Sequence, residues 1–290
     1  MPTFSRRKKN GGAPRAPRFS RLRRFGRRAE DKGGPRGRGI YLLPNAFTTG
    51  ALFCGFYAIV MAMNQRFEHA CWAVFIAMVL DGLDGRVARL TNTQSEFGAQ
   101  YDSLADMVSF GAAPALVLYE WSLKGLGKLG WIAAFVYCAG AALRLARFNT
   151  NIEVVDKRFF QGLPSPAAAA LVVGFIMMMT DPDINVSARQ VDWVSWGLAV
   201  FAGLTMVSNV PFYSFKDVNF RKSVPFIVVF LIALGFALLA IDPPKVLWPI
   251  FVVYGLSGYA VFAIQRAKGK RVSIIPTDDD PVEMDKVERR

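Results

Sequence analysis

Apolar stretches of 17 to 24 residues recur along this chain, and they limit its possible folds more than any other feature. Helices of about 20 apolar residues cross a bilayer, and backbone exposed to lipid must satisfy its own hydrogen bonds. Hydrophobic residues make up 53% of the 290 residues, which is too many for an ordinary soluble domain. The sequence therefore predicts an all-α, polytopic membrane helical bundle with eight spans: 40–63, 69–90, 107–123, 129–147, 165–181, 191–209, 224–241 and 245–264.

The N-terminal segment differs sharply from the spans in its charge. Residues 1–39 hold fourteen Lys and Arg against two acids, Glu30 and Asp31, with frequent Gly and Pro. Such composition without apolar periodicity predicts a disordered tail. A nucleic-acid-binding arm is one interpretation. We favour a cytoplasmic tail that fixes topology and touches anionic lipid headgroups, with no nucleic-acid partner.

The distribution of positive charge predicts the orientation in the membrane. With the N-terminus in the cytoplasm, the cytoplasmic segments carry 30 Lys and Arg and the opposite side carries 5. The positive-inside rule then predicts a protein of the cell inner membrane type with both termini in the cytoplasm. The chain divides into a basic tail at 1–39, a membrane core at 40–209, additional spans at 210–264 and a polar C-terminal tail at 265–290.

Four aspartates lie where the second predicted span ends and the third begins, on the cytoplasmic side. Asp81 and Asp84 are three residues apart, and Asp102 and Asp106 are four residues apart. On helices these spacings place each pair on one face. A polar turn separates the two helices, so the hairpin directs four carboxylates at one another.

Carboxylates at such close range repel one another. Proton uptake relieves the repulsion, and so do divalent cations, of which Mg²⁺ and Mn²⁺ suit oxygen ligands. Four acids can hold two ions, and a two-metal site suits phosphoryl transfer. On the face of Asp81 and Asp84, Gly85 and Ala88 leave room for a substrate, and Arg89 adds a charge suited to phosphate.

Two other interpretations of the aspartates remain. Acids at a helix end often face water, and acids inside membranes also mark ion or proton pathways of transporters. The clustering at one membrane face, rather than near the midplane, argues against a pathway. A cation-coupled transporter therefore stands as the alternative from another functional class.

The aspartate region resembles the signature of the CDP-alcohol phosphotransferase family, D-x2-D-G-x2-A-R-x8-G-x3-D-x3-D. Every fixed position of that pattern is met, over 26 residues: Asp81, Asp84, Gly85, Ala88, Arg89, Gly98, Asp102 and Asp106. The resemblance implies a six-helix membrane core, to which the last two spans are additions. It also implies a homodimer and a transferase that joins an alcohol to the phosphatidyl group of a CDP-linked lipid and releases CMP.

The resemblance also implies roles for individual residues. Asp81, Asp84, Asp102 and Asp106 correspond to ligands of two divalent cations, and Asp106 to the general base as well. The stretch "LPNAFTTGALFCG" resembles the first-helix motif of the family, although Asn45 and Thr48 are also suited to capping a helix. The residues expected to bind CDP-diacylglycerol are Asn45, Thr48, Gly85, Ala88, Arg89 and Ser95.

Two stretches bear on the acceptor alcohol. "ALRLARFNT" (142–150) and "KRFFQGLPSPAAAA" (157–170) resemble the phosphatidylserine synthase branch of the family, which implies L-serine as acceptor. Arg144, Arg147 and Asn149 are the candidate serine-binding residues, because two guanidinium groups suit a carboxylate. The arginines could equally hold a lipid phosphate or anchor the helix. Glycerol phosphate, inositol or choline remain alternative acceptors for the same chemistry.

Overall fold

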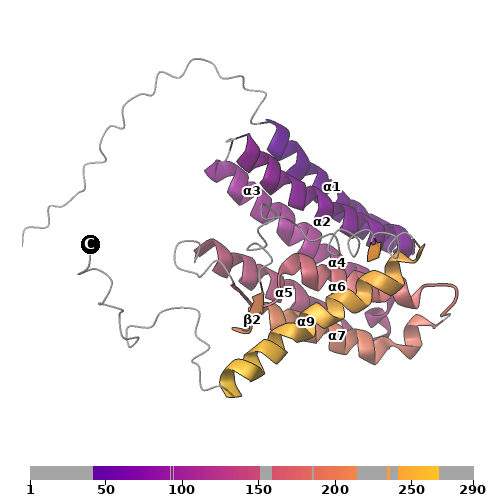
Figure 1. Cartoon of the computed structure of the whole chain (residues 1–290). Helices are drawn as coiled ribbons and strands as arrows, with labels where there is room; N and C mark the ends of the chain where they lie inside the picture. Colours follow the sequence, from indigo (N-terminus) through magenta and orange to yellow (C-terminus); the bar gives the residue numbers. More distant parts are fainter. Residues whose placement is uncertain are drawn as a thin grey trace, which may run out of the picture. The chain divides into compact units, whose positions relative to one another are not determined.

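The chain is almost entirely helical where its structure is described. The computed structural model describes residues 42–91, 93, 95–150, 159–184, 186–213, 234–235 and 241–267 (Figure 1). The prediction of an all-α bundle is confirmed within these residues. In chain order the helices are α1 (Leu42–Met63), α2 (Phe67–Leu90), α3 (Glu96–Asp106), the π-helical turn η1 (Met107–Ala112), α4 (Ala113–Trp121), the short turn η2 (Leu123–Leu126), α5 (Lys128–Thr150), α6 (Ser165–Met179), the short turn η3 (Ala188–Gln190), α7 (Asp192–Val207) and α9 (Pro243–Ala267).

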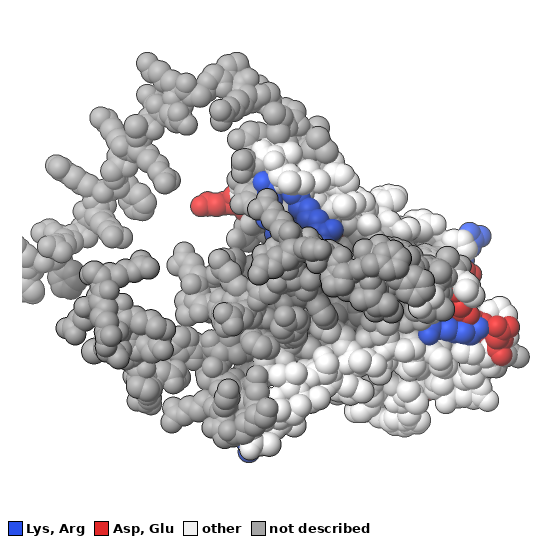
Figure 2. Space-filling model, in the orientation of Figure 1, with Lys and Arg blue, Asp and Glu red and all other residues white. Residues whose placement is uncertain are grey.

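Three of the described helices are long and apolar enough to cross a membrane. They are Asn45–Met63, Lys128–Thr150 and Pro243–Ile264, and α6 and α7 are shorter apolar helices. On the face drawn in Figure 2, the coloured charged side chains lie toward the ends of the described region, and the described residues visible between them are uncharged. The chain is an integral membrane protein. Most of the predicted span 224–241 and both tails lie outside the described residues.

Local signals account for the helix limits around the aspartates. α1 and α2 pack along each other as a hairpin, and the turn between them contains Gln65 at a φ of 60°. Ser95 begins α3, because its Oγ accepts the backbone N–H of Gly98 at 3.0 Å, the usual role of an N-cap serine. Helix α3 therefore begins right after the polar turn that follows α2, and the two acidic helices are neighbours in sequence.

Helix α6 forms the centre of the core. It packs against α2, α4, α7 and α9. Its buried residues are mostly small or β-branched, which lets neighbouring helices approach closely. They include Ala168, Ala169, Ala170, Val172, Val173 and Ile176.

A short pair of strands was not predicted from the sequence. β1 (Phe159–Gln161) and β2 (Pro211–Tyr213) pair antiparallel, with Phe160 opposite Phe212. β1 leads into α6 and β2 follows α7, so the pair ties the start of one helix to the end of the other. Such a pair joins segments about 50 residues apart, which helical periodicity does not reveal.

Helix α9 is fastened to the core at its N-terminal end by charges. Lys245 Nζ lies 2.8 Å from Asp242 Oδ2, 2.9 Å from Asp183 Oδ2 and 3.2 Å from Asp181 Oδ2. Asp181 and Asp183 follow α6, so the lysine joins the two helices. Further along, Trp248 of α9 packs against Phe175 of α6, with ring centroids 5.8 Å apart.

Candidate active site

The structure brings three of the four motif aspartates together. Asp81 on α2 and Asp102 and Asp106 on α3 each offer a carboxylate oxygen, and these oxygens lie within 4.8 Å of one another. Each side chain is half-buried. Oxygen atoms at this spacing are suited to a shared divalent cation, because carboxylates are the preferred ligands of Mg²⁺ and Mn²⁺. The acidic group of the chain could thus hold a metal ion.

Asp84 occupies a different position from the other three. It is buried, with 6% of its surface exposed, and its carboxylate accepts a hydrogen bond from the Thr48 hydroxyl of α1. The helical spacing places Asp81 and Asp84 on one face, yet only Asp81 belongs to the group of three. Thr48 thus links the first helix to the acidic motif, a partnership that spacing within α2 does not indicate.

Burial changes the acidity of the two α3 aspartates, which precede the span predicted at 107–123. Burial, followed by the charges of Asp81 and Asp84, raises the pKa of Asp102 to about 7. Burial, followed by the charges of Asp81 and Asp102, raises the pKa of Asp106 to about 9, although Arg144 opposes the shift. Both carboxyls therefore hold protons readily when no cation balances their charge.

A π-helical turn directly follows Asp106. In η1, Ser109 donates a hydrogen bond to Ala51 O of α1 at 3.0 Å, and Tyr137 of α5 donates one to Phe110 O at 3.0 Å. Ser109, Phe110 and Tyr137 are all buried. π-Turns inside helices are frequent at functional sites, and this one sets the rotation of Asp106 relative to α4. The sequence did not predict this turn, because helical periodicity does not reveal one inserted residue.

The residues expected to contact the nucleotide border the same region. A Cβ added to Gly98 would lie 3.1 Å from Ser95 Oγ and 3.7 Å from Asn45 Oδ1, so α1 and the start of α3 meet there. Gly85 faces open space, since a Cβ added to it would meet no atom within 4 Å. Ala88 is half-buried and Arg89 is exposed. Gly85 and Arg89 are thus accessible on α2, and Asn45 and Ser95 lie beside Gly98 at the start of α3.

Arg144, on α5, is a basic residue whose charge acts on Asp106. Its Nη1 donates a hydrogen bond to Ser165 Oγ at 2.7 Å, and its guanidinium interacts electrostatically with Asp106. Its Nε is enclosed and has no hydrogen-bond partner among the described residues. An enclosed donor of this kind is suited to an anionic ligand, because leaving a buried N–H unpaired is costly. From the sequence no role was predicted for Ser165, which lies in the stretch "KRFFQGLPSPAAAA".

Arg147 and Asn149 have other partners. Arg147 Nη1 donates to Val207 O at 2.9 Å and to Asn209 Oδ1 at 3.0 Å, at the end of α7. Asn149 Nδ2 donates to Ser103 Oγ of α3 at 3.1 Å. The two arginines therefore point to different neighbours rather than acting as one fork. Arg144 faces the acidic group, while Arg147 and Asn149 join α5 to α7 and α3.

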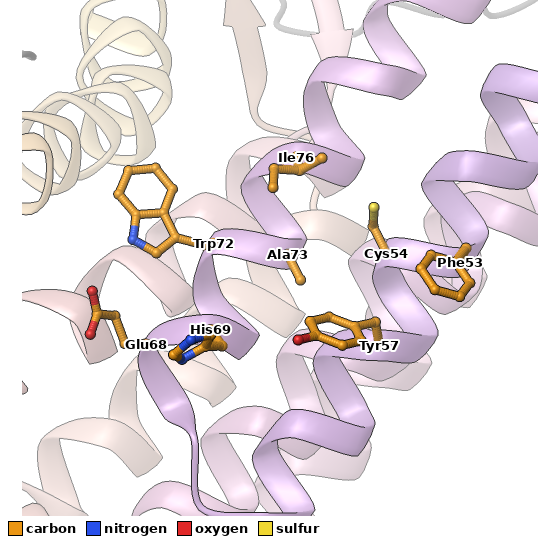
Figure 3. Close-up of a pocket in the computed structure, with 8 residues that line it drawn as sticks. All are labelled: Phe53, Cys54, Tyr57, Glu68, His69, Trp72, Ala73 and Ile76. Atoms are coloured by element: carbon orange, nitrogen blue, oxygen red, sulfur yellow. The ribbon is translucent and has the colours of Figure 1, made fainter.

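A cavity of about 350 Å³ lies elsewhere, between α1 and α2 near the turn that joins them (Figure 3). Its walls are mostly apolar, and the single histidine of the chain, His69, lies at its edge. His69 precedes Asp81 by twelve residues, which is about 18 Å along a helix. The cavity is therefore separate from the acidic group. Its lining residues are Phe53, Cys54, Tyr57, Glu68, His69, Trp72, Ala73 and Ile76.

Comparison with known proteins gives the family of the chain. The sequence model of the CDP-alcohol phosphatidyltransferase family matches residues 41–208. A protein of Helicobacter pylori (strain J99) named CDP-diacylglycerol–serine O-phosphatidyltransferase is 37% identical over 217 residues, 75% of this chain and 90% of that protein. Proteins of the same name from Methanocaldococcus jannaschii and Saccharomyces cerevisiae are 35% and 33% identical, and the alignments cover 64% and 62% of this chain and 82% and 62% of those proteins. The chain therefore belongs to the CDP-alcohol phosphatidyltransferase family.

Proposed function

We propose that this protein is a phosphatidylserine synthase, which transfers the phosphatidyl group of CDP-diacylglycerol to the hydroxyl of L-serine and releases CMP. The observation that carries the proposal is the position of Arg144 beside Asp106, with an enclosed Nε that has no partner among the described residues. A site that joins a cluster of acids to one guanidinium suits an acceptor bearing both a hydroxyl and a carboxylate. The names of the relatives from three organisms support the same acceptor.

The acidic group is proposed to hold two divalent cations, Mg²⁺ or Mn²⁺. Asp81, Asp102 and Asp106 fit this role because their oxygens lie within 4.8 Å of one another. Asp84 is assigned as the fourth ligand, with Thr48 orienting its carboxylate. When bound, such cations neutralise phosphate oxygens and stabilise the charge of the reacting diphosphate.

Asp106 is assigned as the general base. The serine hydroxyl, whose pKa is far above neutral, needs a carboxylate within hydrogen-bond reach to accept its proton. The serine oxygen then attacks the phosphorus that carries the diacylglycerol, and the bond from that phosphorus to the CMP oxygen breaks. Arg144 holds the serine carboxylate, which orients the hydroxyl toward Asp106.

The donor substrate is assigned to the space between α1, α2 and α3. Arg89 is suited to a phosphate oxygen, and Gly85 and Ala88 allow the nucleotide to approach the α2 backbone. Asn45 and Ser95 lie beside Gly98 at the start of α3, where their polar groups can contact the diphosphate. Thr48 contributes indirectly, through Asp84.

The orientation and the assembly are also proposals. The charge asymmetry supports an active site and both termini in the cytoplasm. The basic tail at 1–39 is suited to anionic headgroups of the same leaflet, which would keep the enzyme near its anionic lipid substrate. Family membership supports a homodimer.

An acceptor assay tests the proposed function. Purified protein in detergent is incubated with CDP-diacylglycerol, MnCl₂ and either labelled L-serine, glycerol 3-phosphate, inositol or choline. We expect labelled lipid only with serine, together with one CMP for each phosphatidylserine formed. Lipid product with another acceptor and none with serine would refute the assignment of the acceptor while leaving the chemistry intact.

Removal of metal is the matched control. EDTA is expected to abolish product formation, and excess Mg²⁺ or Mn²⁺ is expected to restore it. Full activity in EDTA would contradict the role of the acidic group. Cation transport without CDP-lipid, and without CMP release, would instead support the transporter alternative.

A further inference from the structure

The first turn of helix α6 carries backbone donors without an acceptor. The first N–H groups of an α-helix have no partner within the helix itself. Pro166 has no N–H, and no hydrogen bond within the described residues satisfies the N–H groups of Ser165 and Ala167. Pro164, at the N-cap, offers no side-chain acceptor. Together with the partial positive charge of a helix N-terminus, the two donors favour an anion at this position.

Arg144 supplies a second and independent donor at the same place. Its Nη1 donates to Ser165 Oγ at 2.7 Å, which brings the guanidinium to the first residue of α6. Its Nε is enclosed and has no hydrogen-bond partner in the part of the chain that the structure describes. Ser165 is fully buried, and its own O–H donates to none of the described residues. Since leaving buried donors unpaired is costly, these groups are suited to a ligand with acceptor oxygens.

Two hydrogen bonds place this corner opposite the general base. One joins α5 to α3 before Asp106 and after Arg144, and the other joins α5 to η1 after Asp106 and before Arg144. The pairs are Asn149 Nδ2 with Ser103 Oγ at 3.1 Å and Tyr137 Oη with Phe110 O at 3.0 Å. Helix α5 therefore runs antiparallel to α3 and η1 here, with Arg144 and Asp106 facing the same interval between the two contacts.

The backbone before α6 is held in place without a ligand. Leu163 N donates to Thr205 O at 3.1 Å, and Gly162 N donates to Val210 O at 2.9 Å. The φ of Gly162 is 73°, and a Cβ added there would lie 2.3 Å from Met206 O, so this turn requires glycine. The donors of the first turn are therefore preorganised, which lowers the entropy lost when a ligand binds.

We propose that the carboxylate of the acceptor binds at the N-terminus of α6, between the Nε of Arg144 and the hydroxyl of Ser165. This inference rests on the proposed function, and it adds Ser165 and the first turn of α6 to the groups that bind serine. Ser165 Oγ accepts from Arg144 and donates its own hydrogen to the carboxylate. The N–H groups of Ser165 and Ala167 complete the donor set. The corner thus selects an alcohol that carries a carboxylate over one that lacks it.

The first test is the kinetics of Ser165→Ala in the full-length enzyme. The substitution removes one donor to the carboxylate and the partner of Arg144 Nη1. We expect the KM for L-serine to rise about ten-fold, because hydrogen bonds to charged groups contribute about that much. Ethanolamine, which is serine without the carboxylate, serves as a competitor, and its inhibition constant should not change. Equal rises for serine and ethanolamine, or no rise for serine, would overturn the proposal.

Ser195→Ala is the matched control. Ser195, on α7, is also fully buried, and its Oγ has no hydrogen-bond partner among the described residues. The control should leave the KM for serine unchanged, whereas equal effects of the two substitutions would indicate a packing role only. The KM for CDP-diacylglycerol identifies the other anion that could bind here. A rise in that constant instead of the serine constant would assign the corner to a lipid phosphate and refute the proposal.

A fixed carboxylate provides a test that does not depend on activity. In Ser165→Asp the new side chain should pair with Arg144 and with the helix N-terminus, so the melting temperature should equal or exceed that of the unmodified protein. Ser195→Asp buries a carboxylate without a partner and should lower it. Equal losses in both variants would show that the corner does not accept an anion. Failure of the proposed function is distinguishable, because the unmodified enzyme would then incorporate no serine while the two melting temperatures could still differ.

Discussion

At the scale of single residues, Asp106 has the most demanding assignment. Replacing it by Asn keeps the size of the side chain and removes both the proton acceptor and a charge of the acidic group. We expect the turnover number to fall by a factor of about 10² to 10⁴, because a positioned general base usually contributes that much. The melting temperature should change little. The measurement is the initial rate of CMP release. The control is Glu96→Gln, because Glu96 is an exposed acid on the same helix. Retained activity in Asp106→Asn would exclude the base assignment.

A second prediction at this scale concerns the hydrogen bond between Thr48 and Asp84. Thr48→Val removes the hydroxyl that donates to buried Asp84, which leaves a carboxylate short of a partner. We expect the free energy of unfolding to fall by about 1–3 kcal/mol. Thr49→Val is the control, because its hydroxyl meets Tyr101 OH at 2.9 Å on an exposed position. Equal melting temperatures of the two variants would show that the Thr48 hydroxyl is dispensable.

The pKa values of the α3 aspartates predict how stability depends on pH. In metal-free protein the pKa of Asp102 is raised to about 7 and that of Asp106 to about 9, above the unfolded value near 3.8. The folded state then binds more protons than the unfolded state, so these groups contribute stability at low pH that is lost as pH rises toward 9. Thermal melts in EDTA at pH 5 and pH 8 should show the lower melting temperature at pH 8. Mn²⁺ added at pH 8 should restore it, and Asp106→Asn should weaken the dependence.

At the scale of elements, α1 contacts the π-turn η1, which directly follows Asp106. A Cβ added to Gly55 would lie 2.6 Å from Ser109 Oγ and 2.7 Å from Ser109 Cα, so Gly55→Ala must push α1 and η1 apart. Overpacking of this kind costs about 1–3 kcal/mol, and the displacement of η1 should also lower kcat. Gly197→Ala on α7 is the control, because its Cβ would meet no atom within 4 Å. A Gly55→Ala enzyme with normal kcat and stability would contradict the coupling.

At the scale of the whole molecule, the charge asymmetry predicts the orientation. Gln65 lies in the exposed turn between α1 and α2, and Glu96 begins α3 at the opposite end of α2. In intact cells, a membrane-impermeant maleimide should label Gln65→Cys and should reach Glu96→Cys only after permeabilisation. The unmodified chain, whose three cysteines are buried or half-buried, is the control. The reverse pattern would place the active site on the outer face.

Periodicity within the chain determined the helices and the faces on which the aspartates lie, because both depend on residues a few positions apart. The apolar runs predicted α1, α2, α5, α6, α7 and α9 to within a few residues of their observed limits. The spacing of Asp102 and Asp106 likewise predicted a shared face on α3, and the eight motif positions predicted the family.

Tertiary structure alone decided which side chains meet across helices. Thr48 meets Asp84 across 36 residues, Arg144 meets Ser165 across 21, and Tyr259 meets Thr205 across 54. Such pairings depend on the rotation of each helix about its axis and on the angle at which it crosses its neighbours. Both depend on how the side chains of the helices pack together, here around the small residues of α6. The sequence therefore named the acids and Arg144, but only the packed bundle separated Arg144 from Arg147 and placed α9 against α6 and β2.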